Sequence, residues 1–226
     1  MKIKICGLTK ICEAEYLNEN DIDYAGFVFY KKSKRNITLS QALEIMDKLT
    51  GDIKRVAVMV SPTEEFIRQL NELPFDIYQI HGKLTQAVLK ACKRDVWRAL
   101  NIESSAEITA FLTSLPNECK HVRGIVFDAP DFGSGKPFDW EGDARIEERL
   151  KSKLEIILAG GLNKDNVREG IRRFAPDVVD VSSAVEGCDG KDKNKIKAFA
   201  DSSGGCGEIC DFAGGSEAQG QDCPAF

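Results

Sequence analysis

Short apolar runs rich in Val, Ile and Phe recur along the chain, at a mean spacing of roughly 25 residues. Each run is too short for a helix, and its nearly continuous hydrophobicity is typical of a parallel strand that is buried on both faces. The pattern predicts eight strands, at Ile3–Cys6, Ala25–Phe29, Arg55–Val60, Asp76–Ile80, Val96–Leu100, Gly124–Phe127, Glu155–Ala159 and Val178–Val181.

Segments between these runs have helical periodicity. Two apolar stripes stand out, formed by Leu39, Ala42, Leu43 and Met46 and by Phe66, Ile67 and Leu70. Capping residues mark the helix starts: Ser61-Pro62-Thr63-Glu64 places a serine at the cap, a proline at the first helical position and an acid in the first turn. Asn163 marks another start, and Thr38 or Ser40 a third.

Eight alternations of strand and helix predict an α/β protein, a single-domain (β/α)8 TIM barrel over residues 1–200. An open doubly wound sheet is the structural alternative. From Asp201 the chain is rich in Gly and poor in apolar residues, which predicts a disordered C-terminal tail over 201–226. Cys206, Cys210 and Cys223 of this tail are a weak metal-site signal, because their spacing is irregular and no His is near.

Composition narrows the classes of function. The 226 residues carry a net charge of −5 spread along the chain, which argues against a general nucleic-acid binder. No apolar run approaches the ~20 residues that span a bilayer, and no signal-peptide pattern follows Met1, so we expect a cytoplasmic protein. In a reducing compartment, buried free thiols are expected at Cys6, Cys12, Cys92, Cys119 and Cys188.

In a (β/α)8 barrel the ends of the strands that lead into helices form the active face. Cys6 ends the first strand beside Gly7, whose backbone turns sharply or approaches a ligand, and Asp128 ends the sixth. They predict an acid–base pair across the barrel mouth. Cys6 as a base needs a pKa lowered by nearby cations, whereas an apolar mouth raises the pKa of Asp128 and makes it an acid.

Each of these two residues also has a structural interpretation. Cys6 can be one more buried thiol, and Asp128 a helix cap or loop anchor. The stretch after Asp128, through Lys136, is long and contains no helical pattern, which favours a loop that shapes the site or acts as a lid.

Two further strand ends predict a phosphate site. Gly160 and Gly161 follow the seventh strand, and Ser182 and Ser183 follow the eighth. Their backbone N–H groups and hydroxyls, with a following helix N-terminus, suit a phosphate between the last two loops of a barrel.

Four other polar residues stand at strand ends or in loops facing the same side. Arg35 lies in a basic stretch that is either a solvated loop or a carboxylate-binding guanidinium. Gln79 and His81 close the fourth strand and line the pocket, although His81 is equally well explained as a hydrogen-bonded loop residue. Asp180 orients the phosphate loop or caps it.

The chain resembles the phosphoribosylanthranilate isomerase family, the barrel enzymes of tryptophan biosynthesis. The resemblance covers residues 1 to about 200, and the combination of pieces is more specific than any one of them. The matching pieces are Lys4-Ile5-Cys6-Gly7-Leu8-Thr9, Gly26-Phe27-Val28-Phe29-Tyr30 with Ser33-Lys34-Arg35, Gln79-Ile80-His81-Gly82, Gly133-Ser134-Gly135-Lys136 with Phe138-Asp139-Trp140, Ala159-Gly160-Gly161-Leu162-Asn163 and Asp180-Val181-Ser182-Ser183.

The resemblance implies an Amadori rearrangement of N-(5-phosphoribosyl)anthranilate, without a metal or an organic cofactor. By the family's pattern, Asp128 is the general acid that opens the furanose ring and Cys6 the base that takes the C2 proton. Arg35 then engages the anthranilate end, and the Gly160-Gly161 and Ser182-Ser183 loops hold the phosphate. Two departures from the family's pattern are a loop after Asp128 that is shorter than in many relatives, and Ala184 where a Gly is usual.

Two other functions remain as alternatives. One is an aminoaldose isomerase of histidine synthesis, whose chemistry favours two carboxyls at these strand ends, so the thiol of Cys6 argues against it. The other is a non-enzymatic binding or regulatory barrel with an interaction tail. The expected partner is a small phosphorylated substrate, with neither nucleic acid nor membrane, and the expected assembly is a monomer or a homodimer.

Overall fold

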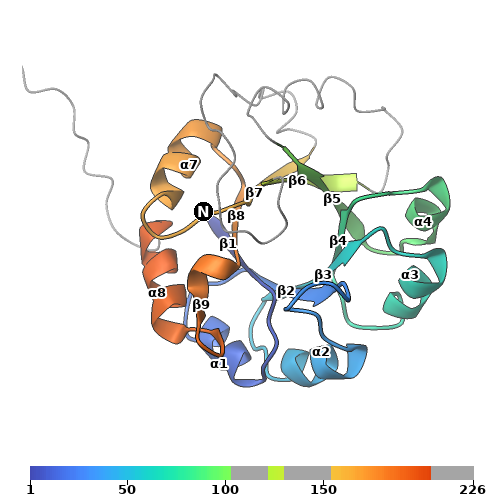
Figure 1. Cartoon of the computed structure of the whole chain (residues 1–226), viewed down its shortest axis with the longest axis horizontal. Helices are drawn as coiled ribbons and strands as arrows, with labels where there is room; N and C mark the ends of the chain where they lie inside the picture. The colour runs from blue at the N-terminus through green and yellow to red at the C-terminus, as the bar shows by residue number, and fades with distance from the viewer. Residues whose placement is uncertain (103–121, 130–153, 205–226) are drawn as a thin grey trace, which may run out of the picture.

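The computed structural model describes residues 1–102, 122–129 and 154–204. Eight parallel strands form a closed barrel in chain order (Figure 1). The strands are β1 Lys2–Cys6, β2 Tyr24–Phe29, β3 Lys54–Val60, β4 Ile77–His81, β5 Asp95–Asn101, β6 Val122–Asp128, β7 Glu155–Leu158 and β8 Val178–Val181. The barrel closes where β1 pairs with β8, from Lys2 opposite Val178 to Ile5 opposite Val181. The predicted strands are confirmed, and the open sheet is excluded.

Helices lie around the outside of the barrel (Figure 1). They are α1 Cys12–Asn18, α2 Leu39–Met46, α3 Glu64–Leu70, α4 Gln86–Ala91, α7 Val167–Phe174 and α8 Lys193–Ser202. After β8 the chain forms a 3-10 turn η1 (Ser183–Val185) and a small antiparallel hairpin of β9 (Glu186–Gly187) and β10 (Gly190–Lys191). None of the described helices is long and apolar enough to cross a membrane.

The helix starts differ from the sequence prediction at two places. Thr38 caps α2 in a full capping box with Gln41, as expected. The cap of α3 is Thr63 rather than Ser61, because the Thr63 hydroxyl accepts from the Phe66 N–H. Ser61 instead has a positive φ of 48° and accepts from the Lys83 N–H. Helix α7 begins at Val167, after a turn in which Asn163 accepts from two backbone N–H groups.

Two further predictions are corrected, one on the buried face of α2 and one on the start of the tail. In α2 the buried residues are Ala42, Ile45 and Met46, while Leu43 is 37% exposed. The tail does not begin at Asp201, because α8 continues through Ser202. The remaining predicted tail, with Cys206, Cys210 and Cys223, lies outside the described residues.

The free thiols are not all buried. Cys6 and Cys92 are buried as predicted, but Cys12 and Cys188 are exposed. Cys12 opens α1, and Cys188 lies in the turn of the β9–β10 hairpin, both on the outside of the barrel. Cys119 lies outside the described residues.

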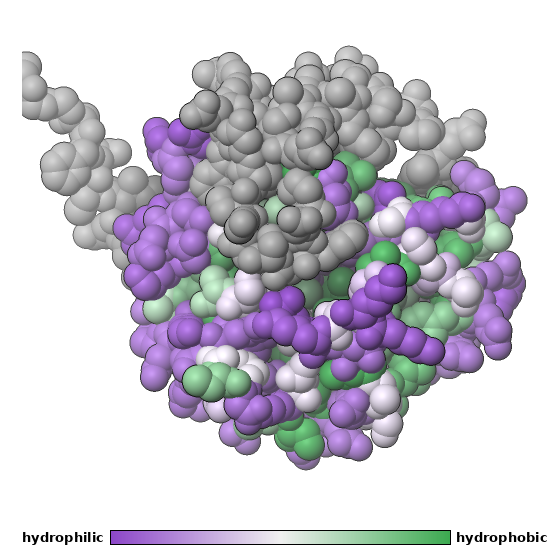
Figure 2. Space-filling model, viewed as in Figure 1, coloured by the Kyte–Doolittle hydropathy of each residue, from purple (hydrophilic) through white to green (hydrophobic). Residues whose placement is uncertain are grey.

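The apolar core has two parts. The larger packs the outward faces of the strands against the helices, and the smaller fills the barrel itself. Inside, Tyr24 and Trp97 meet edge to face with their ring centroids 5.0 Å apart. Hydrophilic side chains occupy most of the described outer surface in the face shown in Figure 2, with small apolar areas between them.

Candidate active site

A cavity of about 410 Å³ opens at the carboxyl ends of the barrel strands. Cavities of this size are typical of small-molecule sites. All of the site residues predicted from the sequence line it, namely Cys6, Arg35, Gln79, His81, Asp128, Gly160, Gly161, Asp180, Ser182 and Ser183. The strand ends of the barrel therefore bring together residues that are more than 170 positions apart in the chain, as the sequence analysis predicted.

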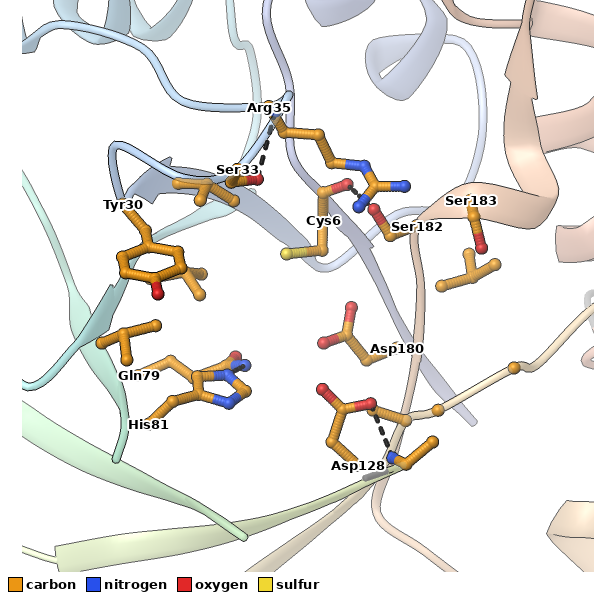
Figure 3. A pocket seen from close by; sticks show the side chains of 18 of the residues that line it. Cys6, Tyr30, Ser33, Arg35, Gln79, His81, Asp128, Asp180, Ser182 and Ser183 are labelled. Atoms are coloured by element: carbon orange, nitrogen blue, oxygen red, sulfur yellow. Dashed lines mark hydrogen bonds between the residues drawn. The ribbon is translucent and has the colours of Figure 1, made fainter. Parts of the chain in front are cut away.

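Cys6 and Asp128 reach this cavity from β1 and β6, and Figure 3 shows both pointing into the same space. Among the described residues, the Asp128 carboxyl accepts one hydrogen bond, from the Ala129 N–H to Oδ1 at 2.9 Å. The loop that Asp128 was alternatively expected to anchor lies outside the described residues. Burial and the charge of Asp180 raise the pKa of Asp128 to about 7. This carboxyl therefore holds a proton that it can donate near neutral pH.

Cys6 differs from expectation in its electrostatics. Burial raises the pKa of the Cys6 thiol above its usual value, and the charge of Asp180 raises it further. The cations expected near it are present, since Lys4 and Lys191 both lower this pKa, but they do not outweigh burial. The prediction of a depressed pKa is wrong.

Lys4 and Asp180 form an ion pair at the inner end of the cavity, which the sequence analysis did not identify. Lys4 Nζ lies 2.5 Å from Asp180 Oδ2, and the lysine is fully buried. Burial opposes the charge on Lys4, but Asp180 and Cys6 outweigh it, so the pKa of Lys4 is raised and the ammonium persists. Among the described residues, Asp180 bonds to Lys4 through Oδ2, and its second oxygen, Oδ1, has no hydrogen-bond partner.

Arg35 crosses over Gly7 and is 9% exposed. Gly7 has a φ of +83°, and a Cβ there would come within 2.4 Å of the Arg35 side chain, so the glycine makes room for the guanidinium. The Arg35 Nε donates to Glu186, while Nη2 has no hydrogen-bond partner among the described residues. The arginine is therefore a held side chain with a free donor and not a solvated loop residue.

Gln79 and His81 lie side by side on β4, with their Nε2 atoms 2.9 Å apart. Burial and the charges of Lys4 and Arg98 lower the pKa of His81 to about 3. His81 is consequently a neutral imidazole at physiological pH, both hydrogen-bonded and part of the cavity wall.

The two predicted phosphate segments meet at one edge of the cavity. Gly160 and Gly161 both have positive φ, and a Cβ at Gly160 would lie 2.4 Å from the Ala129 nitrogen. Ser182 donates through its hydroxyl to the Cys6 carbonyl at 2.8 Å. Ser183 opens only the three-residue turn η1, which contains Ala184, so the expected helix does not follow it directly.

Sequence reasoning also missed Glu186 and Lys191, on the β9–β10 hairpin. Lys191 Nζ donates to the Ser182 carbonyl at 3.0 Å and lies 3.2 Å from Glu186 Oε1. Only the tertiary fold brings these residues beside the strand ends, so no sequence motif marks them. Among the described residues no cluster of three or more His, Cys, Asp or Glu is arranged to hold a metal.

Comparison with known proteins gives a consistent result. Residues 3–202 match the family model of N-(5'phosphoribosyl)anthranilate (PRA) isomerase. The chain is 38% identical over 204 residues to the N-(5'-phosphoribosyl)anthranilate isomerase of Listeria monocytogenes (strain HCC23), covering 88% of this chain and 96% of that relative.

Solved structures agree with the sequence comparison. The phosphoribosyl anthranilate isomerase of Thermotoga maritima has a TM-score of 0.77 at 28% identity, covering 90% of this chain and 98% of that one. A structure of such an isomerase in complex with reduced 1-(o-carboxyphenylamino)-1-deoxyribulose 5-phosphate has a TM-score of 0.73 at 29% identity, with the same coverage. The family prediction is confirmed: this chain belongs to the phosphoribosylanthranilate isomerase family.

Proposed function

We propose that this cavity performs the Amadori rearrangement of N-(5-phosphoribosyl)anthranilate to 1-(2-carboxyphenylamino)-1-deoxyribulose 5-phosphate, with Asp128 as general acid and Cys6 as general base. The observation that carries the assignment of roles is the shared cavity. A carboxyl with a pKa of about 7 and a thiol project into it from β6 and β1, and its wall also contains a guanidinium donor and the glycine and serine residues of two loops.

The first step is ring opening. Asp128 donates its proton to the furanose ring oxygen, the bond from that oxygen to C1 breaks, and the anilino nitrogen supplies the electron pair that forms the C1=N Schiff base. A pKa of about 7 leaves Asp128 protonated in a large fraction of molecules at neutral pH.

The second step needs a base. The Cys6 thiolate takes the proton from C2, and the electron pair moves to form the enolamine. A proton then enters at C1 while the enol oxygen loses its own, and the ketone results. Because the pKa of the Cys6 thiol is raised and that of Asp128 lies lower, the reactive form with ionised Cys6 and protonated Asp128 is the minor one of a coupled pair.

The ends of the substrate fit two different parts of the wall. Arg35 presents its free Nη2 to the anthranilate carboxylate, because a guanidinium matches carboxylate geometry. Gly160, Gly161, Ser182 and Ser183 hold the phosphate through N–H groups and hydroxyls. Asp180 Oδ1 and Gln79 Oε1 are buried acceptors without partners among the described residues, and they suit sugar hydroxyls between these ends.

We expect no metal or organic cofactor, because proton transfers alone complete the reaction. The partner is this one phosphorylated substrate. A Thermotoga maritima relative, 30% identical over 90% of this chain, is described as a dimeric enzyme, and for this chain a monomer or a homodimer is expected.

Turnover of freshly prepared phosphoribosylanthranilate, followed by the loss of its fluorescence, tests the function. Cys6→Ser and Asp128→Asn should each reduce kcat by about 10²- to 10⁴-fold. Cys12→Ser and Asp165→Asn change the same residue types at exposed positions and should match the wild type. Turnover that survives both site variants would exclude the mechanism, and an inactive wild type would exclude the substrate.

A further inference from the structure

One charged residue near the cavity has no part in the proposed reaction. Lys191 is the last residue of β10 and 6% exposed, and its side chain is almost completely buried. A buried ammonium is costly unless several partners satisfy it, so its contacts show what it stabilises.

Those contacts join two parts of the site. Lys191 Nζ lies 3.2 Å from Glu186 Oε1, the carboxylate oxygen that also accepts from Arg35 Nε. The same Nζ donates to the Ser182 carbonyl at 3.0 Å and to its hydroxyl at 3.2 Å. That hydroxyl in turn donates to the Cys6 carbonyl, so one continuous polar chain runs from Arg35 to Cys6.

The backbone of Lys191 is fixed as well. Its N–H donates to Glu13 Oε1 at 2.7 Å, and Glu13 Oε2 accepts from the Thr9 N–H at 2.6 Å in the loop that follows Cys6. Gly190 has a φ of +104°, and a Cβ there would lie 2.4 Å from Glu13 Oε1. The hairpin is thereby attached to the β1–α1 loop, and the lysine has little freedom to move.

We propose that Lys191 is a positioning residue of the isomerase site, which joins Arg35, through Glu186, to the Ser182 turn and stabilises negative charge at Cys6. This inference rests on the proposed function. The base must become a thiolate in a buried place. The Lys191 ammonium donates to the Ser182 hydroxyl, which donates to the backbone carbonyl of Cys6, so a fixed positive charge lies close to Cys6 and offsets part of that cost.

Several other charges act on the same thiol. Lys4 on β1 also favours the thiolate, and Asp180 on β8 opposes it. Burial lowers the pKa of Lys191 and Arg35 lowers it further, while Glu186 and Cys6 raise it and favour the ammonium. Lys4 is paired with Asp180, whose charge also acts on Cys6, whereas Lys191 is paired with Glu186 on the hairpin. Removal of Lys191 should therefore change Cys6 without breaking the inner ion pair.

The experiment measures thiolate directly, as the rate at which iodoacetamide alkylates Cys6 at pH 8, read by peptide mass spectrometry. Lys191→Met and Lys191→Gln should each slow this rate about tenfold, because a neighbouring cation lowers a thiol pKa by roughly one unit or more. The same variants should lower kcat/KM about 10- to 100-fold, since small misplacements at a site have effects of that size. Lys197→Met, which removes an exposed lysine of α8, is the matched control and should change neither value.

The direction of the change separates the two explanations. If Lys191 were only structural, its loss would loosen the site, expose Cys6 and speed alkylation. An alkylation rate of Cys6 that is unchanged or faster in folded Lys191→Gln overturns the proposal. This holds even if Lys191→Met does not fold. An inactive wild type would overturn the proposed function, while the alkylation rates would still report whether Lys191 acts on Cys6.

Discussion

The two ends of the barrel interior are built on opposite principles. At the end where the strands begin, Tyr24 and Trp97 fill the space with aromatic rings. At the end where the strands finish, Cys6, Asp128 and Asp180 surround a cavity. The end where the strands begin is filled by packed aromatic rings, and the end where they finish is lined by titratable side chains around a cavity. The first end therefore contributes mainly to stability, and the second carries the chemistry.

Hydrogen bonding shows the same division. At the packed end the Tyr24 hydroxyl donates to Glu155 at 3.0 Å, and Lys2 Nζ reaches the same carboxylate at 2.8 Å. At the cavity end, Arg35 Nη2, Gln79 Oε1 and Asp180 Oδ1 have no partner among the described residues. Buried polar atoms without a partner cost free energy, and a polar ligand that bonds to them removes that cost.

The largest expected effect is a loss of stability at the packed end. Trp97→Ala removes a ring that lies against Tyr24 and against Gly124, where a Cβ would come within 2.5 Å of it. It should lower the free energy of unfolding by about 3–5 kcal/mol, the range for a buried Trp. Denaturant unfolding measures this, and kcat/KM per folded molecule should stay within a few-fold of wild type. A large loss of activity in folded molecules would break the division between the two ends.

At the cavity end, Asp128→Asn should do the reverse and stabilise the fold while removing activity. The pKa of Asp128 rises from 3.8 to about 7 on folding, so folded Asp128 keeps its proton while the unfolded chain has lost it. The unfolding free energy should therefore fall as pH rises from about 4 to about 7, by up to about 4 kcal/mol at about 1.4 kcal/mol per pH unit.

The measurement is urea unfolding of the wild type and Asp128→Asn at pH 5 and pH 8. The variant lacks the ionisable group, so its advantage over wild type should be larger at pH 8. Asp165→Asn, at an exposed carboxyl, serves as the control. An advantage that shrinks with rising pH would contradict the raised pKa of Asp128.

Much of this contrast was predictable from the sequence, for a simple reason. Parallel strands that are buried on both faces have nearly continuous apolar sequences. In a (β/α)8 barrel, the residues that follow these strands all lie at the same end of the barrel. Cys6, Asp128, Gly160 and Ser182 were found in this way. The closure of β8 onto β1 then follows from the number of strands.

What the sequence did not reveal depends on tertiary contacts. Lys4 lies inside an apolar strand, two positions before Cys6. Alternate residues of a strand share a face, so this spacing indicates that Lys4 points into the barrel beside Cys6, although the sequence analysis did not use it. Glu186 and Lys191 come from a hairpin that local pattern does not predict. The raised pKa of the Cys6 thiol results from burial, which needs coordinates.

A smaller effect is expected for the charge beside the acid. Asp180→Asn removes a carboxylate that raises the pKa of Asp128, and leaves the Lys4 ammonium to lower it. The acid limb of the kcat/KM profile should move to lower pH by about one unit. The informative quantity is the pH at which this limb has its midpoint. The maximum of the profile should fall as well, because Asp180 also lines the cavity. A limb that stays in place or moves upward would separate Asp180 from the proton held by Asp128.

The smallest effect should come from the ion pair at the rim of the packed end. Lys2 is half exposed beside Glu155, with side-chain exposures of 51% and 23%, so solvent and salt screen the pair. Lys2→Met should cost less than about 1 kcal/mol of unfolding free energy, a value that 1 M salt should nearly abolish. Lys48→Met, at another exposed pair, is the control for losing a surface lysine. A loss of several kcal/mol of unfolding free energy that persists in salt would mean that charge, and not only ring packing, stabilises the packed end. The two ends would then differ in solvent access and not in chemistry.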